Sequence, residues 1–324
     1  MKIGLISFAH MHAFSYAAHL LDSEEVELAY IWDDNVQRGK DNAKKYNCTF
    51  YSDLDDFLNT DMKAVIICSE NTKHYEYVTR SAKAGKHILC EKPIATSIKD
   101  AQEMIGICEE EEVIFQIAYP VRFAPVVRRA KVLINDGVIG DILAISGKNR
   151  GKMPGGWFVD KEKSGGGAAV DHIVHLLDLI RWTLNDGVKS VYAELDTRFH
   201  DIDVEDCGMV SLELESGIIA SIDPSWSRPQ TFPNWGDVIL KFVGTKGNLT
   251  IDVFKEHSIY YNDTAEKIQQ LEWSENMDKG LIEDFIACVR EGRKPSITGN
   301  DGLKTLEVVM AAYESNEKKE KVLL

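Results

Sequence analysis

Short apolar runs alternate with longer amphipathic segments through the first third of the chain. The apolar runs fall at residues 3–7, 26–32, 64–68, 87–90 and 113–118. Segments with the spacing of surface helices lie between them, at residues 13–21, 37–46, 73–84 and 97–111. Strands that alternate with helices form βαβ units with right-handed crossovers and a parallel sheet. The pattern predicts an α/β, Rossmann-like, doubly wound domain over residues 1–119.

The pattern changes after residue 120. A helix is expected at residues 125–136, and strands follow at residues 142–148, 188–197, 207–214, 218–226, 238–243 and 248–253. Val210, Leu212 and Leu214 alternate with polar residues, which is the period of a half-buried strand. Strands joined by short turns form antiparallel sheets. We therefore expect an α+β domain over residues 120–324 with a large, mainly antiparallel, open-faced sheet, and further helices at residues 168–184, 281–291 and 302–312.

Both faces of this predicted sheet carry apolar side chains. Leu240 and Phe242 alternate with Ile239 and Val243, so one layer of helices leaves an apolar face uncovered. Self-association is the usual way to cover such a face. We expect a homodimer or homotetramer.

Composition narrows the class of partner. The chain has 324 residues. Its formal net charge of -15 argues against nucleic acid or an anionic membrane surface as a binding partner. Apolar runs stay well short of the roughly 20 residues that span a bilayer. The N-terminus opens on a strand pattern without a secretory signal, so we expect a cytoplasmic protein.

The six cysteines lack CxxC spacing, which disfavours a disulfide framework or structural zinc.

The segment Glu91-Lys92-Pro93 directly follows the apolar run at residues 87–90. Ligands of open α/β sheets bind at the carboxyl ends of the strands, where Lys92 is expected. Pro93 fixes its own φ and restricts the backbone of Lys92. Lys92 is either a ligand-facing cation or a surface lysine before a helix, and this pattern alone leaves both open.

A dinucleotide site needs a tight turn after the first strand, where backbone amides meet the pyrophosphate. This chain has Ser7-Phe8-Ala9-His10-Met11-His12 there, without a glycine. Asp33, at the end of the second strand, is placed to bind a ribose diol and to repel a 2′-phosphate, which favours NAD over NADP. The alternative is that Asp33 or Asp34 caps the next helix, and likewise that Asn71 or Thr72 caps a later one.

The helix expected at residues 168–184 carries a polar face. Asp171, His175 and Asp178 share that face, while apolar residues form a separate stripe. Three glycines at residues 165–167 precede the helix, where a ligand or another backbone must come close. An aspartate and a histidine one turn apart are either a solvated pair or part of a site.

These features, in this order along the chain, resemble the Gfo/Idh/MocA oxidoreductases. The resemblance rests on Glu91-Lys92-Pro93 in a Rossmann domain, then Arg122-Phe123, then the triple glycine with Asp171 and His175. It implies NAD(P)-dependent hydride transfer at a secondary alcohol of a sugar, polyol or related compound.

By the same resemblance Lys92, Asp171 and His175 match the catalytic positions. His175 would exchange the hydroxyl proton, Lys92 would stabilise charge on the same oxygen, and Asp171 would orient His175 or hold a substrate hydroxyl. Arg122 and Trp157 are added as substrate contacts, and no metal ligand is assigned. The expected cofactor contacts are Ser7, Phe8, Ala9, His10, Met11, His12, Asp33, Ser69, Asn71, His74, Glu91 and Lys92.

Two alternatives belong to other classes. His10 and His12 resemble the metal pair of amidohydrolase barrels, although such a barrel needs eight strand-helix units. A narrower version keeps the predicted fold and binds a metal at these histidines. The second alternative is a non-catalytic sensor that binds a nucleotide or a sugar, which the glycine-free turn favours and Lys92, Asp171 and His175 oppose.

Overall fold

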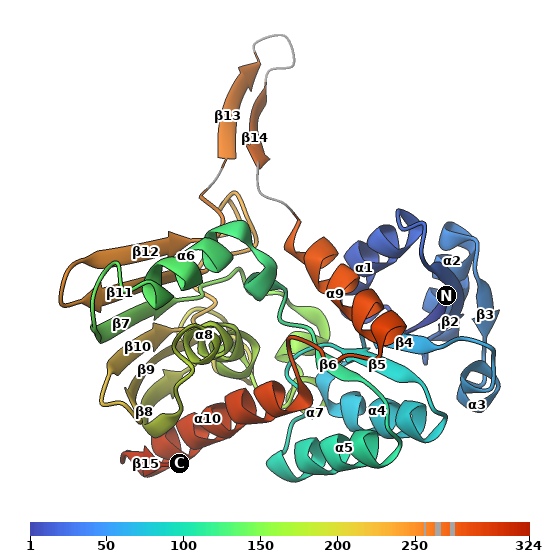
Figure 1. The fold of residues 1–324 in the computed structure, drawn as a ribbon, viewed down its shortest axis with the longest axis horizontal. Helices are drawn as coiled ribbons and strands as arrows, with labels where there is room; N and C mark the ends of the chain where they lie inside the picture. Colours follow the sequence, from blue (N-terminus) through green and yellow to red (C-terminus); the bar gives the residue numbers. More distant parts are fainter. Residues whose placement is uncertain (256, 263–266, 273–275) are drawn as a thin grey trace. The chain divides into compact units, whose positions relative to one another are not determined.

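The computed structural model describes residues 1–255, 257–262, 267–272 and 276–324. The chain forms two compact units (Figure 1). Unit 1 comprises Met1–Pro120, Glu162–Gly165 and Asp278–Leu306, and unit 2 comprises Val121–Lys161, Gly166–Met277 and Glu307–Leu324. Residues 162–165 and 278–306 were expected in the second domain, whereas the structure groups them with unit 1. Apolar periodicity identifies a helix but does not tell which sheet it covers.

Unit 1 contains a six-stranded parallel sheet in the order β3-β2-β1-β4-β5-β6. Its strands are β1 (Lys2–Ile6), β2 (Glu27–Trp32), β3 (Thr49–Tyr51), β4 (Ala64–Ile67), β5 (His87–Cys90) and β6 (Phe115–Ile117). This is the strand order of a Rossmann fold, so the predicted doubly wound domain is confirmed. The short β3 and the helix α3 (Leu54–Leu58) lacked a readable period and were not predicted.

Helices cover this sheet. They are α1 (His12–Leu21), α2 (Val36–Tyr46), α4 (His74–Lys83), α5 (Ile98–Glu110) and, from late in the chain, α9 (Met277–Glu291). The hydroxyl of Ser15 on α1 donates to Asp278 Oδ2 at 2.6 Å, and α9 runs beside α1 (Figure 1). The strands β1, β4 and β5 are almost entirely buried, as expected for a parallel sheet covered on both faces.

Unit 2 contains a seven-stranded sheet in the order β12-β11-β7-β10-β9-β8-β15. Its strands are β7 (Ile142–Lys148), β8 (Val188–Asp196), β9 (Cys207–Leu214), β10 (Ile219–Asp223), β11 (Ile239–Gly244), β12 (Asn248–Asp252) and β15 (Val322–Leu323). β7 and β10 pair in parallel and the other neighbours pair antiparallel. The mainly antiparallel sheet is therefore confirmed, and the amidohydrolase-barrel alternative is wrong because both main sheets are open.

The long helix α8 (Ala168–Leu184) packs against β9 and β10, with Ile173, Leu176, Leu177 and Ile180 buried (Figure 1). α6 (Pro125–Asn135) packs against β12, and α10 (Gly299–Lys318) begins in unit 1 and ends in unit 2. Three 3-10 turns, η1 (Asn71–Lys73), η2 (Pro120–Phe123) and η3 (Gly156–Val159), and the short α7 (Lys161–Ser164) complete the helical elements.

A further strand pair, β13 (His257–Asn262) with β14 (Lys267–Glu272), forms a separate two-stranded antiparallel sheet that was not predicted. Within the described residues, none of the helices is both long enough and apolar enough to span a membrane.

Candidate functional site

The glycine-free turn after β1 keeps a backbone shape that glycine normally supplies. Ser7 has a φ of 70° and is fully buried. A non-glycine residue in this left-handed region is uncommon and strained. Its hydroxyl oxygen lies 3.2 Å from the amide nitrogen of Ala9 and 3.1 Å from Arg38 Nη2, and it accepts from both. Ser7 therefore stands where a dinucleotide-binding turn usually has its first glycine. Its own side chain helps to hold the left-handed backbone conformation that glycine would adopt without strain.

The amides of this turn already have acceptors inside unit 1. Phe8 N donates to Asp33 Oδ2 at 2.9 Å, His10 N donates to the Cys68 carbonyl at 2.9 Å, and His12 N donates to His10 Nδ1 at 3.2 Å. α1 begins at His12, and its N-cap residue Met11 makes no side-chain capping bond. A pyrophosphate can use the N-terminus of α1, but to accept from the amides of Phe8, His10 or His12 it must displace their present acceptors.

The Asp33 carboxylate is covered by an arginine. Arg38 Nε donates to Asp33 Oδ2 at 2.8 Å and Arg38 Nη2 donates to Oδ1 at 2.7 Å. The Asp33 side chain is fully buried, whereas that of Arg38 is 28% exposed. The structure thus presents a guanidinium where the sequence predicted an open carboxylate. Neither Asp33 nor Asp34 caps α2, because Asn35 is its N-cap and accepts from Arg38 N.

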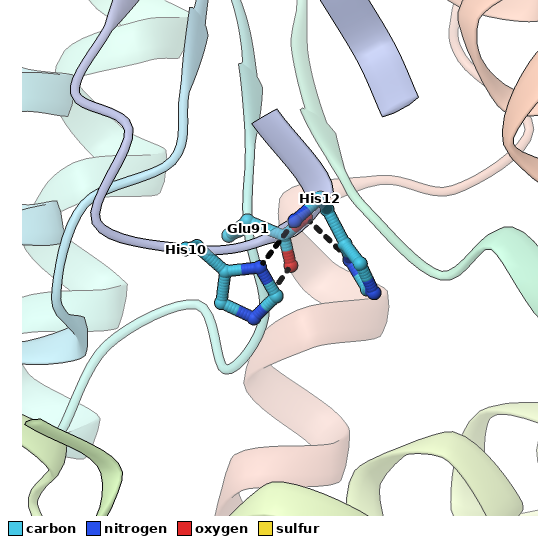
Figure 2. A group of neighbouring side chains, drawn as sticks. All are labelled: His10, His12 and Glu91. Atoms are coloured by element: carbon cyan, nitrogen blue, oxygen red, sulfur yellow. Dashed lines mark hydrogen bonds and ion pairs between the residues drawn. The ribbon is translucent and has the colours of Figure 1, made fainter. Parts of the chain in front are cut away.

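Glu91 joins the end of β5 to α1. It is buried, and its Oε1 accepts from the hydroxyl of Tyr16 at 2.7 Å. The same oxygen lies 2.9 Å from His12 Nδ1 (Figure 2). Its Oε2 accepts from Lys92 N at 3.2 Å and lies 3.9 Å from His10 Nε2. One carboxylate therefore collects donors from α1 and from the backbone of Lys92, and it lies close to His10 in the turn after β1.

The electrostatics of this cluster follow from its charges. Burial alone would raise the pKa of the Glu91 carboxyl, but His10, His12 and Lys92 outweigh burial and hold that pKa well below its ordinary value. Burial alone would lower the pKa of His12, but the charge and hydrogen bond of Glu91 raise it above its ordinary value of 6.5. A carboxylate facing an imidazolium is the state that this geometry favours.

His10, His12 and Glu91 also meet the spacing of a metal site, since one ligand atom from each lies within 4.8 Å of the others. To bind a metal through Nε2, His10 must carry its proton on Nδ1. That nitrogen already accepts the amide proton of His12. Metal binding would therefore bring the Nδ1–H of His10 and the backbone N–H of His12 face to face, which is repulsive. The geometry favours a hydrogen-bonded cluster without a metal.

The loop after β4 braces the segment that carries Lys92. The amide of Asn71 donates to the Ser164 carbonyl at 2.8 Å, and His74 Nδ1 donates to the Pro93 carbonyl at 2.8 Å. Ser69 donates to the Glu70 carbonyl at 3.1 Å. Asn71 and Thr72 lie inside η1, whose N-cap is Glu70, so the alternative that either residue caps the next helix is wrong. Lys92 is 4% exposed, which also removes the surface-lysine alternative.

In unit 2, α8 carries Asp171 and His175. Asp171 Oδ2 accepts from Trp226 Nε1 at 3.2 Å and lies 3.3 Å from Nε2 of the neighbouring His172. His175 is 7% exposed, one helical turn further on. Asp171 thus has protein donors of its own, and the solvated-pair alternative does not describe it.

The two predicted substrate contacts in unit 2 also have protein partners. Arg122 donates from Nε and Nη2 to the two oxygens of Asp178, at 2.7 and 2.5 Å, and both side chains are buried. Trp157, in η3, stacks on Phe158 with ring centroids 3.9 Å apart. Their contact with a substrate stays a prediction.

The glycines before α8 serve the packing of the protein itself. A Cβ on Gly167 would lie 2.1 Å from the Glu205 carbonyl oxygen, and one on Gly166 would lie 2.1 Å from the hydroxyl of Tyr313. Glu205 Oε1 accepts from the amides of Gly167 and Ala169 at 2.9 and 3.0 Å and from Tyr313 at 2.7 Å. Glu205 therefore caps α8 from a distant loop.

Sequence reasoning missed several of these residues: Tyr16, Arg38, His172, Glu205 and Trp226. Each acts through a partner brought close by the fold, and the local sequence gives no sign of it. His172 alone had a usable signal, because it follows Asp171 directly on a buried helix.

Comparison with known proteins agrees with this architecture. Residues 2–119 match a family model described as an oxidoreductase family with an NAD-binding Rossmann fold, and residues 127–250 match the GFO/IDH/MocA C-terminal domain. Myo-inositol 2-dehydrogenase of Thermotoga maritima is 26% identical, covering 100% of this chain and 98% of its own. 2,7-anhydro-N-acetylneuraminate hydratase of Escherichia coli is 32% identical, covering 77% of this chain and 64% of its own.

Among solved structures, GenD2 from gentamicin A biosynthesis, in complex with NAD, superposes with a TM-score of 0.92 at 25% identity. The match covers 100% of this chain and 96% of that one.

We expect the Glu91 cluster to stabilise the fold most between about pH 4.5 and pH 6.5, the ordinary pKa values of its two partners. The depressed pKa of Glu91 gives stability that is present above its ordinary pKa and is lost as pH falls towards its folded value. The raised pKa of His12 gives stability that is complete below its ordinary pKa and is lost as pH rises through its folded value.

Urea unfolding of wild type and Glu91→Gln across this pH range measures the effect. The difference in unfolding free energy should peak inside the window. Glu24→Gln, at an exposed position, is the control. A difference for Glu91→Gln that does not change with pH would refute the charged pair.

Proposed function

The chain belongs to the Gfo/Idh/MocA family of oxidoreductases, and on that basis we propose that it transfers a hydride between NAD and a secondary alcohol or ketone of a sugar, polyol or related compound. One observation carries the proposal. The family models match both parts of the chain, and the three predicted catalytic residues lie on or next to ordered elements. Lys92 is buried two residues after β5, His175 is buried on α8, and Asp171 on α8 is partly exposed.

The proposed chemistry divides between cofactor and protein. A bound nicotinamide supplies the hydride chemistry, while the protein supplies position, charge and proton transfer. We assign His175 as the base that takes the hydroxyl proton during oxidation and as the acid in reduction. Lys92 would donate to the same oxygen and stabilise its developing negative charge. Asp171 would orient His175 or a neighbouring substrate hydroxyl.

Two observations bear on the choice of cofactor. GenD2 is described in complex with NAD, which supports NAD here. The partly exposed Arg38 over Asp33 is a cation suited to a 2′-phosphate, which supports NADP. We propose NAD, because Asp33 and Asp34 both surround that guanidinium with negative charge.

The second candidate is a reaction without net oxidation. A relative named as a hydratase is 32% identical to this chain. A substrate screen must therefore follow product as well as the absorbance of the nicotinamide.

We also propose a location in the cytoplasm and substrate contacts through Trp157 and Arg122. All six cysteines are free thiols, which supports a reducing compartment such as the cytoplasm. Trp157, stacked on Phe158, offers a flat aromatic surface for a sugar ring, and Arg122 would act on substrate only through an atom not already committed to Asp178.

We also propose a homodimer or homotetramer that forms through the open face of the unit 2 sheet. The register aligns Lys241, Ser146, Ser221, Ser211 and Tyr192 in one row across five strands. Three serines form the middle of this row, between Lys241 and Tyr192. Tyr192, Met209 and Ile219, on β8, β9 and β10, are exposed at 37%, 54% and 62%.

Cofactor binding is the first test. Titration of the wild-type protein with NADH and with NADPH, followed by energy transfer from tryptophan, should show saturable binding with lower Kd for NADH. Arg38→Ala should weaken NADPH more than NADH, because it removes the cation near the ribose. Binding of neither cofactor would contradict the proposed function and favour the sensor.

Substitution of the catalytic residues is the second test. Lys92→Ala and His175→Ala should each lower kcat by about 100-fold or more, the usual effect of losing a proton-transfer or charge-stabilising group. The Kd for NADH should change little in His175→Ala. Lys99→Ala and His19→Ala serve as matched controls outside the proposed site. Unchanged turnover in either test variant would remove that residue from the mechanism.

The assembly is tested by light scattering during size-exclusion chromatography. Ile219→Asp and Met209→Asp should shift the protein towards monomer, because each places a charge on the proposed contact. Val138→Asp, at a position 56% exposed elsewhere in unit 2, should leave the mass unchanged. A monomeric wild type at micromolar concentration would end this proposal.

A further inference from the structure

His172 lies against Asp171 in the interior of unit 2 and is 4% exposed. Its Nδ1 is 2.8 Å from the Pro224 carbonyl oxygen, and its Nε2 is 3.3 Å from Asp171 Oδ2. The rings of Trp226 and Trp235 lie 6.4 and 5.9 Å from its ring, centroid to centroid. The two nitrogens of the imidazole therefore face two oxygen atoms.

The backbone next to the ring is equally close. A Cβ on Gly151 would lie 2.7 Å from His172 Cε1, so a glycine is required there. Gly151 forms a bridge with Gly236, and its amide donates to the Ser225 carbonyl at 3.1 Å. The imidazole is thus enclosed by backbone and cannot turn its nitrogens to other partners without moving these segments.

Counting protons fixes the state of this pair. A carbonyl oxygen only accepts, so His172 Nδ1 carries a hydrogen. An ionised Asp171 also only accepts, and its Oδ2 already accepts from Trp226 Nε1. A neutral His172 would then place the lone pair of Nε2 against a lone pair of Oδ2 in a buried setting, which is costly. A proton between Nε2 and Oδ2 removes that conflict.

We propose that His172 is a positioning residue for the reaction: it shares a proton with Asp171 and thereby fixes the Asp171 carboxyl on α8, one turn before His175. The role in turnover rests on the proposed function, whereas the shared proton does not. Asp171 is a charged group in contact with His172, and Pro224, Trp226, Trp235 and Gly151 contribute uncharged groups.

The shared proton has a consequence for pH dependence. At high pH its loss leaves two lone pairs opposed, and Asp171 is pushed from its position. Turnover should then fall at high pH with an ionisation that belongs to the His172–Asp171 pair. Cofactor affinity should be insensitive to this ionisation, because the predicted cofactor contacts lie in unit 1.

Nitrogen NMR of histidine rings tests the proton directly and needs no activity. In wild type labelled with 15N-histidine at pH 8.5, about two units above the ordinary histidine pKa, one ring assigned by its loss in His172→Gln should carry protons on both nitrogens. That signature should disappear in Asp171→Asn. His12→Asn identifies the ring of His12, whose pKa is raised by Glu91.

Kinetics test the positioning role. His172→Phe keeps the ring volume but has no donor, and it should lower kcat by roughly 10-fold to 100-fold, less than the loss of His175 itself. His172→Gln offers Asp171 an amide N–H that does not titrate. It should recover most of kcat and abolish the fall in kcat at high pH. His200→Asn, at a second His–Asp contact in unit 2, is the matched control and should change neither.

The outcomes are distinct. A His172 ring in wild type with one protonated nitrogen at pH 8.5, or a doubly protonated ring that persists in Asp171→Asn, overturns the shared proton. A confirmed proton with unchanged kcat and pH profile in His172→Phe overturns the positioning role. If wild type shows no oxidoreductase turnover, the proposed function fails while the NMR result still decides the shared proton.

Discussion

A single buried carboxylate organises the cofactor side of unit 1. Glu91 directly follows β5, and its two oxygens receive donors from Tyr16, from His12 and from the backbone of Lys92. A buried charge is tolerated only when it is paired and hydrogen-bonded, so these partners are required together. The orientation of α1, the shape of the turn before it and the start of the Lys92 segment therefore depend on one another.

In unit 2 a carboxylate likewise holds a structural element in place, here the start of α8. Its first amides have no side-chain cap of their own, and Glu205 supplies one from a loop distant in sequence. Burial raises the pKa of Glu205 even though three donors oppose that effect. Tyr313 and Glu205 can come this close only because Gly166 and Gly167 have no side chains. The helix that carries Asp171 and His175 thus begins at a rigid point.

The sequence predicted what depends on periodicity and missed what depends on contacts between distant segments. Apolar runs gave the Rossmann sheet and the mainly antiparallel sheet, because burial imposes a period on each strand. The triple glycine was recognised as a place of close approach, but only the structure identifies Glu205 and Tyr313 as the groups that approach.

Asp33 is a similar case. Its position at the end of β2 could be read from the sequence, whereas its hydrogen bonds with Arg38 on α2 are a contact between side chains that only the structure shows. β3 and α3 were missed because three and five residues are too few to show a period.

The serine in the turn after β1 has a consequence for how this sequence can change. A glycine at position 7 would relieve the strain of a positive φ, yet it would also remove the oxygen that Arg38 and the amide of Ala9 both use. Arg38 in turn holds Asp33, which holds the amide of Phe8. Substitutions at these positions are therefore expected to be non-additive. A change to a glycine-rich turn is therefore expected to need coordinated substitutions at several positions, and a single exchange of Ser7 for glycine is not equivalent to it.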